Sequence, residues 1–122
     1  MTLDLAWVAF DCKDPVALAR FWAEVLGFEI EADSDDEIFL HPKNGVGPNV
    51  MFLKVPDEKV VKNRLHFDLR PDDQAAEMER VLALGATRVD IGQGDVTWEV
   101  LADPEGNEFC ILRALKPDEE GP

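Results

Sequence analysis

The chain has 122 residues and a formal net charge of -14. This length fits one ordinary domain, and a hydrophobic fraction of 46% is typical of a globular protein. The negative charge opposes binding to nucleic acid or anionic lipid, so we predict neither as a partner. The sequence has no apolar run of about 18 residues and no signal-peptide pattern at its start, so we expect a cytoplasmic protein whose two cysteines are thiols.

The first half of the chain predicts a strand, a helix and three further strands. Residues 5–12 alternate between apolar and other side chains, as in a half-buried strand. Asp14 followed by Pro15 is a helix start, and Gly27 is a typical residue after a helix end. The three strands that follow are predicted at residues 28–32, 37–41 and 49–55.

The second half repeats this plan. Residues 64–70 alternate, Pro71-Asp72-Asp73 opens a second helix, and Gly85 ends it. The strands match at an offset of 59 residues and the helix ends at an offset of 58. The last predicted strands lie at 87–91, 96–102 and 108–112, with a tight turn over 103–107.

A repeat of this period predicts two tandem βαβββ modules and the α+β fold class, with a mainly antiparallel sheet. We expect a single domain over residues 1–115, with module bounds of about 5–55 and 64–114. The acidic tail over 116–122 is expected to be disordered.

Each helix covers one face of its sheet, so the uncovered faces are where a small molecule would bind. If the halves curve together, these faces form one concave wall of mixed aromatic, apolar and polar groups. The predicted residues of the uncovered faces include Trp7, Ala9, Asp11, Arg64, His66, Asp68, Arg70, Glu108, Cys110 and Leu112.

His66 and Asp68 suggest a general base and its orienting partner. The alternative is a polar strand face whose groups only hydrogen-bond to their neighbours. Cys110, flanked by Phe109 and Ile111, is interpreted as a small buried hydrophobic residue rather than a nucleophile. His41, which precedes a proline, is interpreted as a solvated loop residue.

Two tryptophans are candidates for stacking on a planar ligand. Trp7 lies on the first strand, and Trp98 lies in the segment 96–102, whose facing the pattern leaves open. Either residue can instead belong to the core.

The stretches DPVALARFWAEVLG (14–27) and LADPEGNEFCIL (101–112) resemble the vicinal oxygen chelate superfamily of glyoxalase, bleomycin-resistance and extradiol dioxygenase proteins. More narrowly, the chain is similar to glyoxalase-like domains of unassigned activity. The resemblance implies paired βαβββ modules that curve around a cleft, and a homodimer.

Metal-dependent members of that superfamily take ligands from four strand positions, which the repeat places at Trp7, Met51, His66 and Cys110. The ligands usual there are His, Gln or Glu, and only His66 matches. His66 and Cys110 give two donors where a catalytic zinc site uses three. Asp68 offers a carboxylate, but we expect its side chain to lie a full strand step away. We therefore predict no metal and no cofactor, with a divalent ion at His66 as the alternative.

These observations favour a metal-independent small-molecule-binding protein. The alternative is a lyase or isomerase that uses His66 with Asp68, with or without a divalent metal. The predicted ligand-binding residues are Trp7, Met51, His66, Asp68, Trp98 and Cys110.

Overall fold

The computed structural model describes residues 3–119 as two compact units, which divide between Lys59 and Val60. The boundary falls between the two predicted modules, in the segment between residues 55 and 64. Within residues 3–119, no helix is both long enough and apolar enough to cross a membrane.

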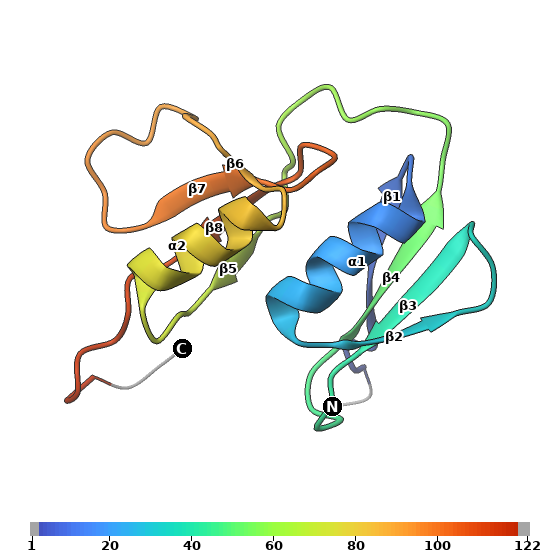
Figure 1. The fold of residues 1–122 in the computed structure, drawn as a ribbon, viewed down its shortest axis with the longest axis horizontal. Coiled ribbons are helices and arrows are strands. Elements are labelled where there is room, and N and C mark those ends of the chain that lie inside the picture. The colour runs from blue at the N-terminus through green and yellow to red at the C-terminus, as the bar shows by residue number, and fades with distance from the viewer. Residues whose placement is uncertain (1–2, 120–122) are drawn as a thin grey trace. The chain divides into compact units, whose positions relative to one another are not determined.

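Unit 1 has one helix on one face of a four-stranded sheet (Figure 1). The sheet order is β1-β4-β3-β2, with β1 parallel to β4 and the other pairs antiparallel. As predicted, Asp14 caps the helix, because its Oδ1 accepts a hydrogen bond from the Ala17 amide at 3.2 Å. The elements are β1 (Trp7–Cys12), α1 (Pro15–Leu26), β2 (Glu29–Ala32), β3 (Glu37–His41) and β4 (Asn49–Lys54).

Unit 2 has the same plan, with the order β5-β8-β7-β6 and a parallel β5–β8 pair. Asp73 caps its helix through the Ala76 amide at 3.1 Å. The elements are β5 (Phe67–Leu69), α2 (Gln74–Ala83), β6 (Thr87–Arg88), β7 (Glu99–Ala102) and β8 (Glu108–Ile111). The predicted α+β class and the two βαβββ modules are therefore confirmed.

The internal repeat is also visible in the strand register. Ala9 pairs with Met51 in unit 1, and Asp68 pairs with Cys110 in unit 2, with both members shifted by 59 residues. The two parallel pairs are therefore equivalent, and Trp7 is the counterpart of His66.

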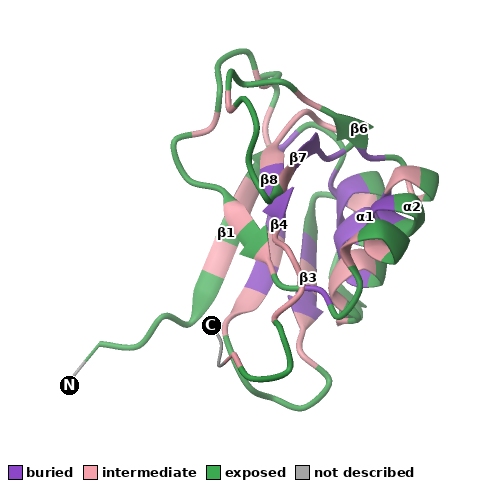
Figure 2. Cartoon of the chain, turned by 90° about the vertical axis from the view of Figure 1, so that its left-hand side faces the viewer, coloured by how far each residue is buried: buried purple, intermediate pink, exposed green. Residues whose placement is uncertain are grey.

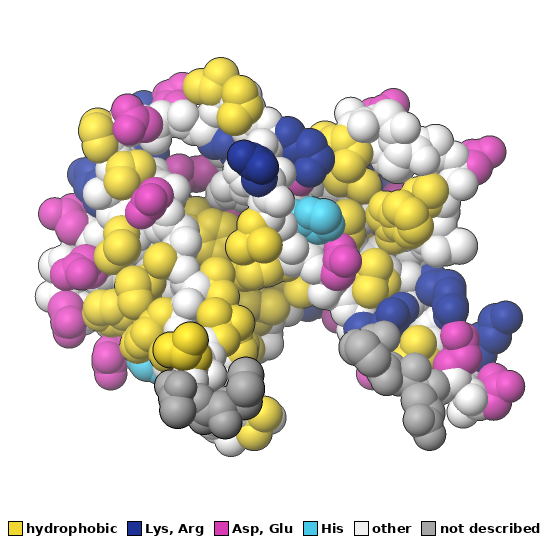
Figure 3. All heavy atoms as spheres, turned by 180° about the vertical axis from the view of Figure 1, so that it is seen from behind, with side chains coloured by type: hydrophobic (Ala, Val, Ile, Leu, Met, Phe, Trp, Pro, Cys, Tyr) yellow, Lys and Arg dark blue, Asp and Glu magenta, His cyan; other side chains and the backbone are white. Residues whose placement is uncertain are grey.

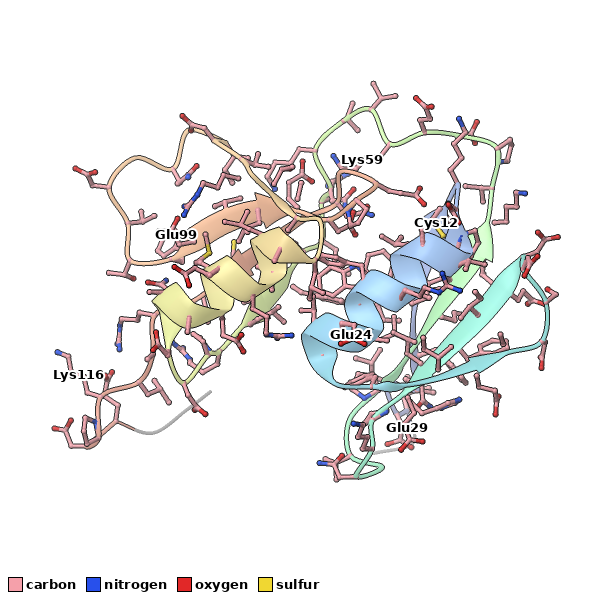
Figure 4. All side chains as sticks on the ribbon, in the orientation of Figure 1. Cys12, Glu24, Glu29, Lys59, Glu99 and Lys116 are labelled. Atoms are coloured by element: carbon pink, nitrogen blue, oxygen red, sulfur yellow. The ribbon has the colours of Figure 1, made fainter. Side chains whose placement is uncertain are left out.

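Each core lies between a helix and one sheet face. In unit 1, α1 contacts β3 and β4, and the rings of Phe10 and Phe52 stack with centroids 5.1 Å apart. Figure 2 shows the buried strand residues of β3 and β4 in purple. Cys12, labelled in Figure 4, is buried at the end of β1, with its thiol 3.7 Å from the Leu53 carbonyl. In unit 2, Met78 and Val81 of α2 are buried.

Strands of unit 2 are shorter than predicted. The strand expected over 64–70 is only β5, so His66 precedes it, and Leu65 is 77% exposed instead of facing the core. The strand expected over 96–102 begins at Glu99, which leaves Trp98 outside the sheet and 40% exposed. Hydrophobic alternation alone does not fix where the pairing of a strand stops, because pairing also depends on the neighbouring strands.

The DPEGN segment between β7 and β8 is a turn built around the buried side chain of Asp103. Its Oδ1 accepts hydrogen bonds from the amides of Glu105 (2.9 Å) and Asn107 (3.0 Å), and Gly106 has φ 87. The predicted tight turn is confirmed, and its motif serves folding rather than chemistry.

Part of the acidic tail lies within the described residues. Residues 116–119 form a turn in which the Glu119 carboxylate pairs with the Arg113 guanidinium at 2.7 Å. This pairing lowers the pKa of Glu119 to about 2. The rest of the predicted tail, 120–122, lies outside the described residues.

Candidate functional site

Three chemically active side chains meet on the sheet face of unit 2 that its helix does not cover. One donor atom each from His66, Asp68 and Cys110 lies within 4.8 Å of the others. His66 Nε2 is 3.2 Å from Asp68 Oδ1, and the two side chains are 39% and 53% exposed. We call this set the His66 cluster.

The expectation that Asp68 lies a full strand step from His66 is wrong. Residues two apart on a regular strand are separated by about 7 Å along it. His66 directly precedes β5, and its imidazole spans this separation and reaches the Asp68 carboxylate. Asp68 and Cys110 are direct partners in the parallel β5–β8 register, which brings in the thiol.

The segment before His66 is tied to the turn before β8. The Asn63 side-chain amide donates to Asn107 Oδ1 at 2.8 Å, and the Asn63 backbone amide donates to Glu108 Oε1 at 3.0 Å. Asn107 is itself fixed by the buried Asp103. The DPEGN turn therefore supports the chain that leads into the cluster.

Cys110 is buried, with 6% of its surface exposed, as the sequence predicted. Burial, with a smaller contribution from the negative charge of Asp68, raises the pKa of its thiol to about 11. Because the thiolate is the reactive form, this environment disfavours a nucleophilic role at neutral pH.

The equivalent positions of unit 1 carry no such cluster. Trp7, Ala9 and Met51 stand where unit 2 has His66, Asp68 and Cys110. Trp7 instead contacts two rings of β3, with centroids 5.5 Å from Phe39 and 5.7 Å from His41.

Sequence reasoning missed His41. It is the last residue of β3, in agreement with the strand predicted over 37–41 and not with its interpretation as a solvated loop residue, and its Nδ1 lies 3.0 Å from Asn49 Oδ1. The alternating pattern of residues 37–41 already places His41 on the same face as Phe39, and that signal outweighs the proline that follows.

Trp98 is not part of the core, because it is exposed in the segment before β7. A solvent-open depression of about 550 Å³ lies nearby in unit 2, and its wall includes the Arg88–Glu99 ion pair of 3.2 Å. It contains none of the predicted site residues. We base the candidate site on the chemistry of the His66 cluster rather than on this depression.

Residues 7–112 match the family model described as "Glyoxalase-like domain". The chain belongs to this family. The match spans both modules, from β1 through β8, and confirms the predicted resemblance to the vicinal oxygen chelate superfamily. A search of curated proteins found no match.

Solved structures share the fold of this chain. A glyoxalase/bleomycin resistance protein/dioxygenase family enzyme from Burkholderia phytofirmans PsJN is 23% identical, with a TM-score of 0.70 over 93% of this chain and 100% of that one. A glyoxalase-related enzyme from Fulvimarina pelagi is 18% identical, with a TM-score of 0.66 over 96% and 95%.

A mutant of the fosfomycin resistance protein FosX from Listeria monocytogenes was solved with Mn(II) and 1S,2S-dihydroxypropylphosphonic acid. It is 17% identical, with a TM-score of 0.70 over 94% of this chain and 95% of that one. At these sequence identities the structural similarity establishes only the fold. The chemistry of this glyoxalase-like protein has to be inferred from its own residues.

Proposed function

We propose that this glyoxalase-like protein binds a small molecule, and that the His66 cluster supplies the polar contacts. The observation that carries the proposal is the meeting of an imidazole, a carboxylate and a thiol on a sheet face that the helix leaves uncovered. A few convergent polar groups beside apolar surface are what small-molecule sites contain.

The same geometry favours a second candidate, a lyase or isomerase with His66 as general base. An ionised carboxylate only accepts hydrogen bonds. Of the two tautomers of a neutral imidazole, Asp68 Oδ1 at 3.2 Å from Nε2 therefore favours the one that carries its proton on Nε2. The Nδ1 lone pair is then available to take a proton from a bound substrate. Asp68 would hold the ring in place and stabilise the imidazolium that forms.

A divalent metal is the remaining variant of this second candidate. Nitrogen, oxygen and sulfur donors within 4.8 Å of one another fit a zinc-like ion, and three protein donors are the number that catalytic zinc sites use. Such an ion would polarise a substrate oxygen or lower the pKa of a bound water. The protonated thiol of Cys110 opposes binding, since it must lose its proton to become a ligand. We therefore keep the metal-independent site as the main proposal.

Ligand screening and metal analysis of the full-length protein test these proposals together. Small-molecule libraries would be screened by NMR, with His66→Ala and Asp68→Asn as variants and Glu79→Gln, an exposed residue of α2, as a control in the same unit. We expect ligands whose binding is lost in the cluster variants and kept in the control. Ligands that bind all variants equally would refute the proposed site.

The metal content of the protein decides between a metal-independent site and a metal site at the His66 cluster. Protein dialysed against Zn²⁺ and then against buffer should retain less than one equivalent. Stoichiometric zinc that is lost in both His66→Ala and Cys110→Ser would overturn the metal-independent proposal. Turnover of a ligand that is abolished in His66→Ala, with the fold intact, would establish the enzyme.

A further inference from the structure

The helix-free face of the unit 1 sheet combines aromatic rings with carboxylates. Strand alternation and register place the side chains, since Val50, Phe52 and Leu40 are buried towards the helix and their neighbours point the other way. We call this surface the unit 1 open face. Its strand residues are Trp7, Ala9, Asp11, Glu29, Glu31, Glu37, Phe39, His41, Asn49, Met51 and Leu53.

Trp7 forms the centre of the aromatic part. Its indole makes edge-type contacts with Phe39 at an interplanar angle of 65° and with His41 at 70°. These contacts fix the orientation of the indole, yet Trp7 remains 37% exposed. An exposed ring held in place by its neighbours can receive a ligand without first losing rotamer freedom.

His41 is held by two groups of the same face. Its Nδ1 lies 3.0 Å from Asn49 Oδ1, and its Nε2 lies 3.7 Å from Glu31 Oε1. The second separation is an ion-pair distance rather than a hydrogen bond, and the Glu31 side chain is 68% exposed. A carboxylate beside the rings is therefore accessible to a ligand.

The charges of this face have one sign. Its carboxylates are Asp11, Glu29, Glu31 and Glu37, and no lysine or arginine stands among these described strand residues. Glu29, labelled in Figure 4, lies on the edge strand β2. Figure 3 shows acidic side chains along the outer border of unit 1, in the left-hand part of the view, around a hydrophobic area. Anionic ligands are repelled here and cationic ones are attracted.

We propose that the unit 1 open face binds organic cations, with Trp7 and Phe39 receiving the alkyl or aromatic ammonium and Glu31 balancing its charge. Ring faces attract cations through their quadrupole, and Trp does so most strongly. The site needs no residue of the His66 cluster, so it stands or falls separately from the proposed function.

Choline and its uncharged isostere 3,3-dimethylbutan-1-ol test this proposal, because they share a shape and differ in charge. Binding to the full-length protein would be measured by NMR titration. We expect choline to shift resonances of β1 and β3, and to bind about tenfold more tightly than the isostere. Raising NaCl from about 20 mM to about 300 mM should weaken choline binding, because salt screens the carboxylates.

Variants locate the site. Trp7→Ala should weaken choline binding by about tenfold, and Glu31→Gln should weaken it less. Glu79→Gln removes an exposed carboxylate from α2 of unit 2 and should change nothing. Phe39→Leu keeps apolar packing while removing a ring, so it tests the site even if Trp7→Ala fails to fold. Equal binding of choline and the isostere, no choline binding at all, or unchanged binding in Phe39→Leu and Glu31→Gln would overturn the proposal.

Discussion

The Cys110 thiol gives the most direct test of the environment at the His66 cluster. Burial and the Asp68 carboxylate raise its pKa from the ordinary 9.0 to about 11. At pH 8 an ordinary thiol with a pKa of 9.0 is about one-tenth thiolate, whereas a thiol at 11 is about one-thousandth thiolate. We therefore expect alkylation of Cys110 to be at least about 100-fold slower than that of a free thiol, because only the thiolate reacts.

Iodoacetamide labelling at pH 8, followed by peptide mapping, measures this rate separately from that of Cys12. Asp68→Asn removes the neighbouring charge and should speed the labelling, while burial, the larger cause, still keeps it slow. Full labelling after urea unfolding provides the internal control. If native Cys110 reacts as fast as a free thiol, then the reasoning about its environment fails and a nucleophilic role has to be reconsidered.

Three further predictions concern stability, and each is measured by urea unfolding. The free energy of unfolding should fall as pH rises from 9.0 towards about 11, because the Cys110 thiol ionises in the unfolded chain at a lower pH than in the folded one. Cys110→Ala should flatten this part of the pH profile. An identical slope in the variant would contradict the assignment of this pH dependence to Cys110. Asp103→Ala should lower the free energy of unfolding by about 2–4 kcal/mol, since it leaves the amides of Glu105 and Asn107 without their acceptor. Asp103→Asn keeps an acceptor oxygen and should lower it less. Equal losses in the two variants would argue against this role of the Asp103 carboxylate. Asp14→Ala should lower the free energy of unfolding by about 1 kcal/mol, because it removes the N-cap of α1. An unchanged free energy of unfolding would show that the cap contributes nothing.

The position of the candidate site was predictable because the two modules repeat. The offset of 59 residues marks Trp7 with His66 and Met51 with Cys110 as equivalent, and the parallel registers confirm the second of these pairs. The close approach of the His66, Asp68 and Cys110 side chains was not predictable. The alternating sequence pattern was interpreted on the assumption that the strand continues through His66. Only the structure shows that His66 lies before β5 and reaches Asp68.

Two histidines illustrate the same limit from opposite sides. His66 was predicted within a strand and stands outside one, while His41 ends β3 as the predicted strand 37–41 does, yet it was interpreted as a solvated loop residue. A single residue at a strand end is decided by the hydrogen bonds and side-chain contacts of its neighbours, which sequence patterns do not contain. For His41 these neighbours are Trp7 and Asn49.

By itself, the sequence determined the fold class, the helix start at Asp14, a second helix start within residues 71–73 and the tight turn over 103–107, because these depend on local hydrogen bonds and on the period of apolar residues. The tertiary structure alone decided where the strands of unit 2 begin and end and which polar groups meet. The meeting of the polar groups depends on pairing between residues more than 40 positions apart, such as Asp68 with Cys110, for which no local pattern exists.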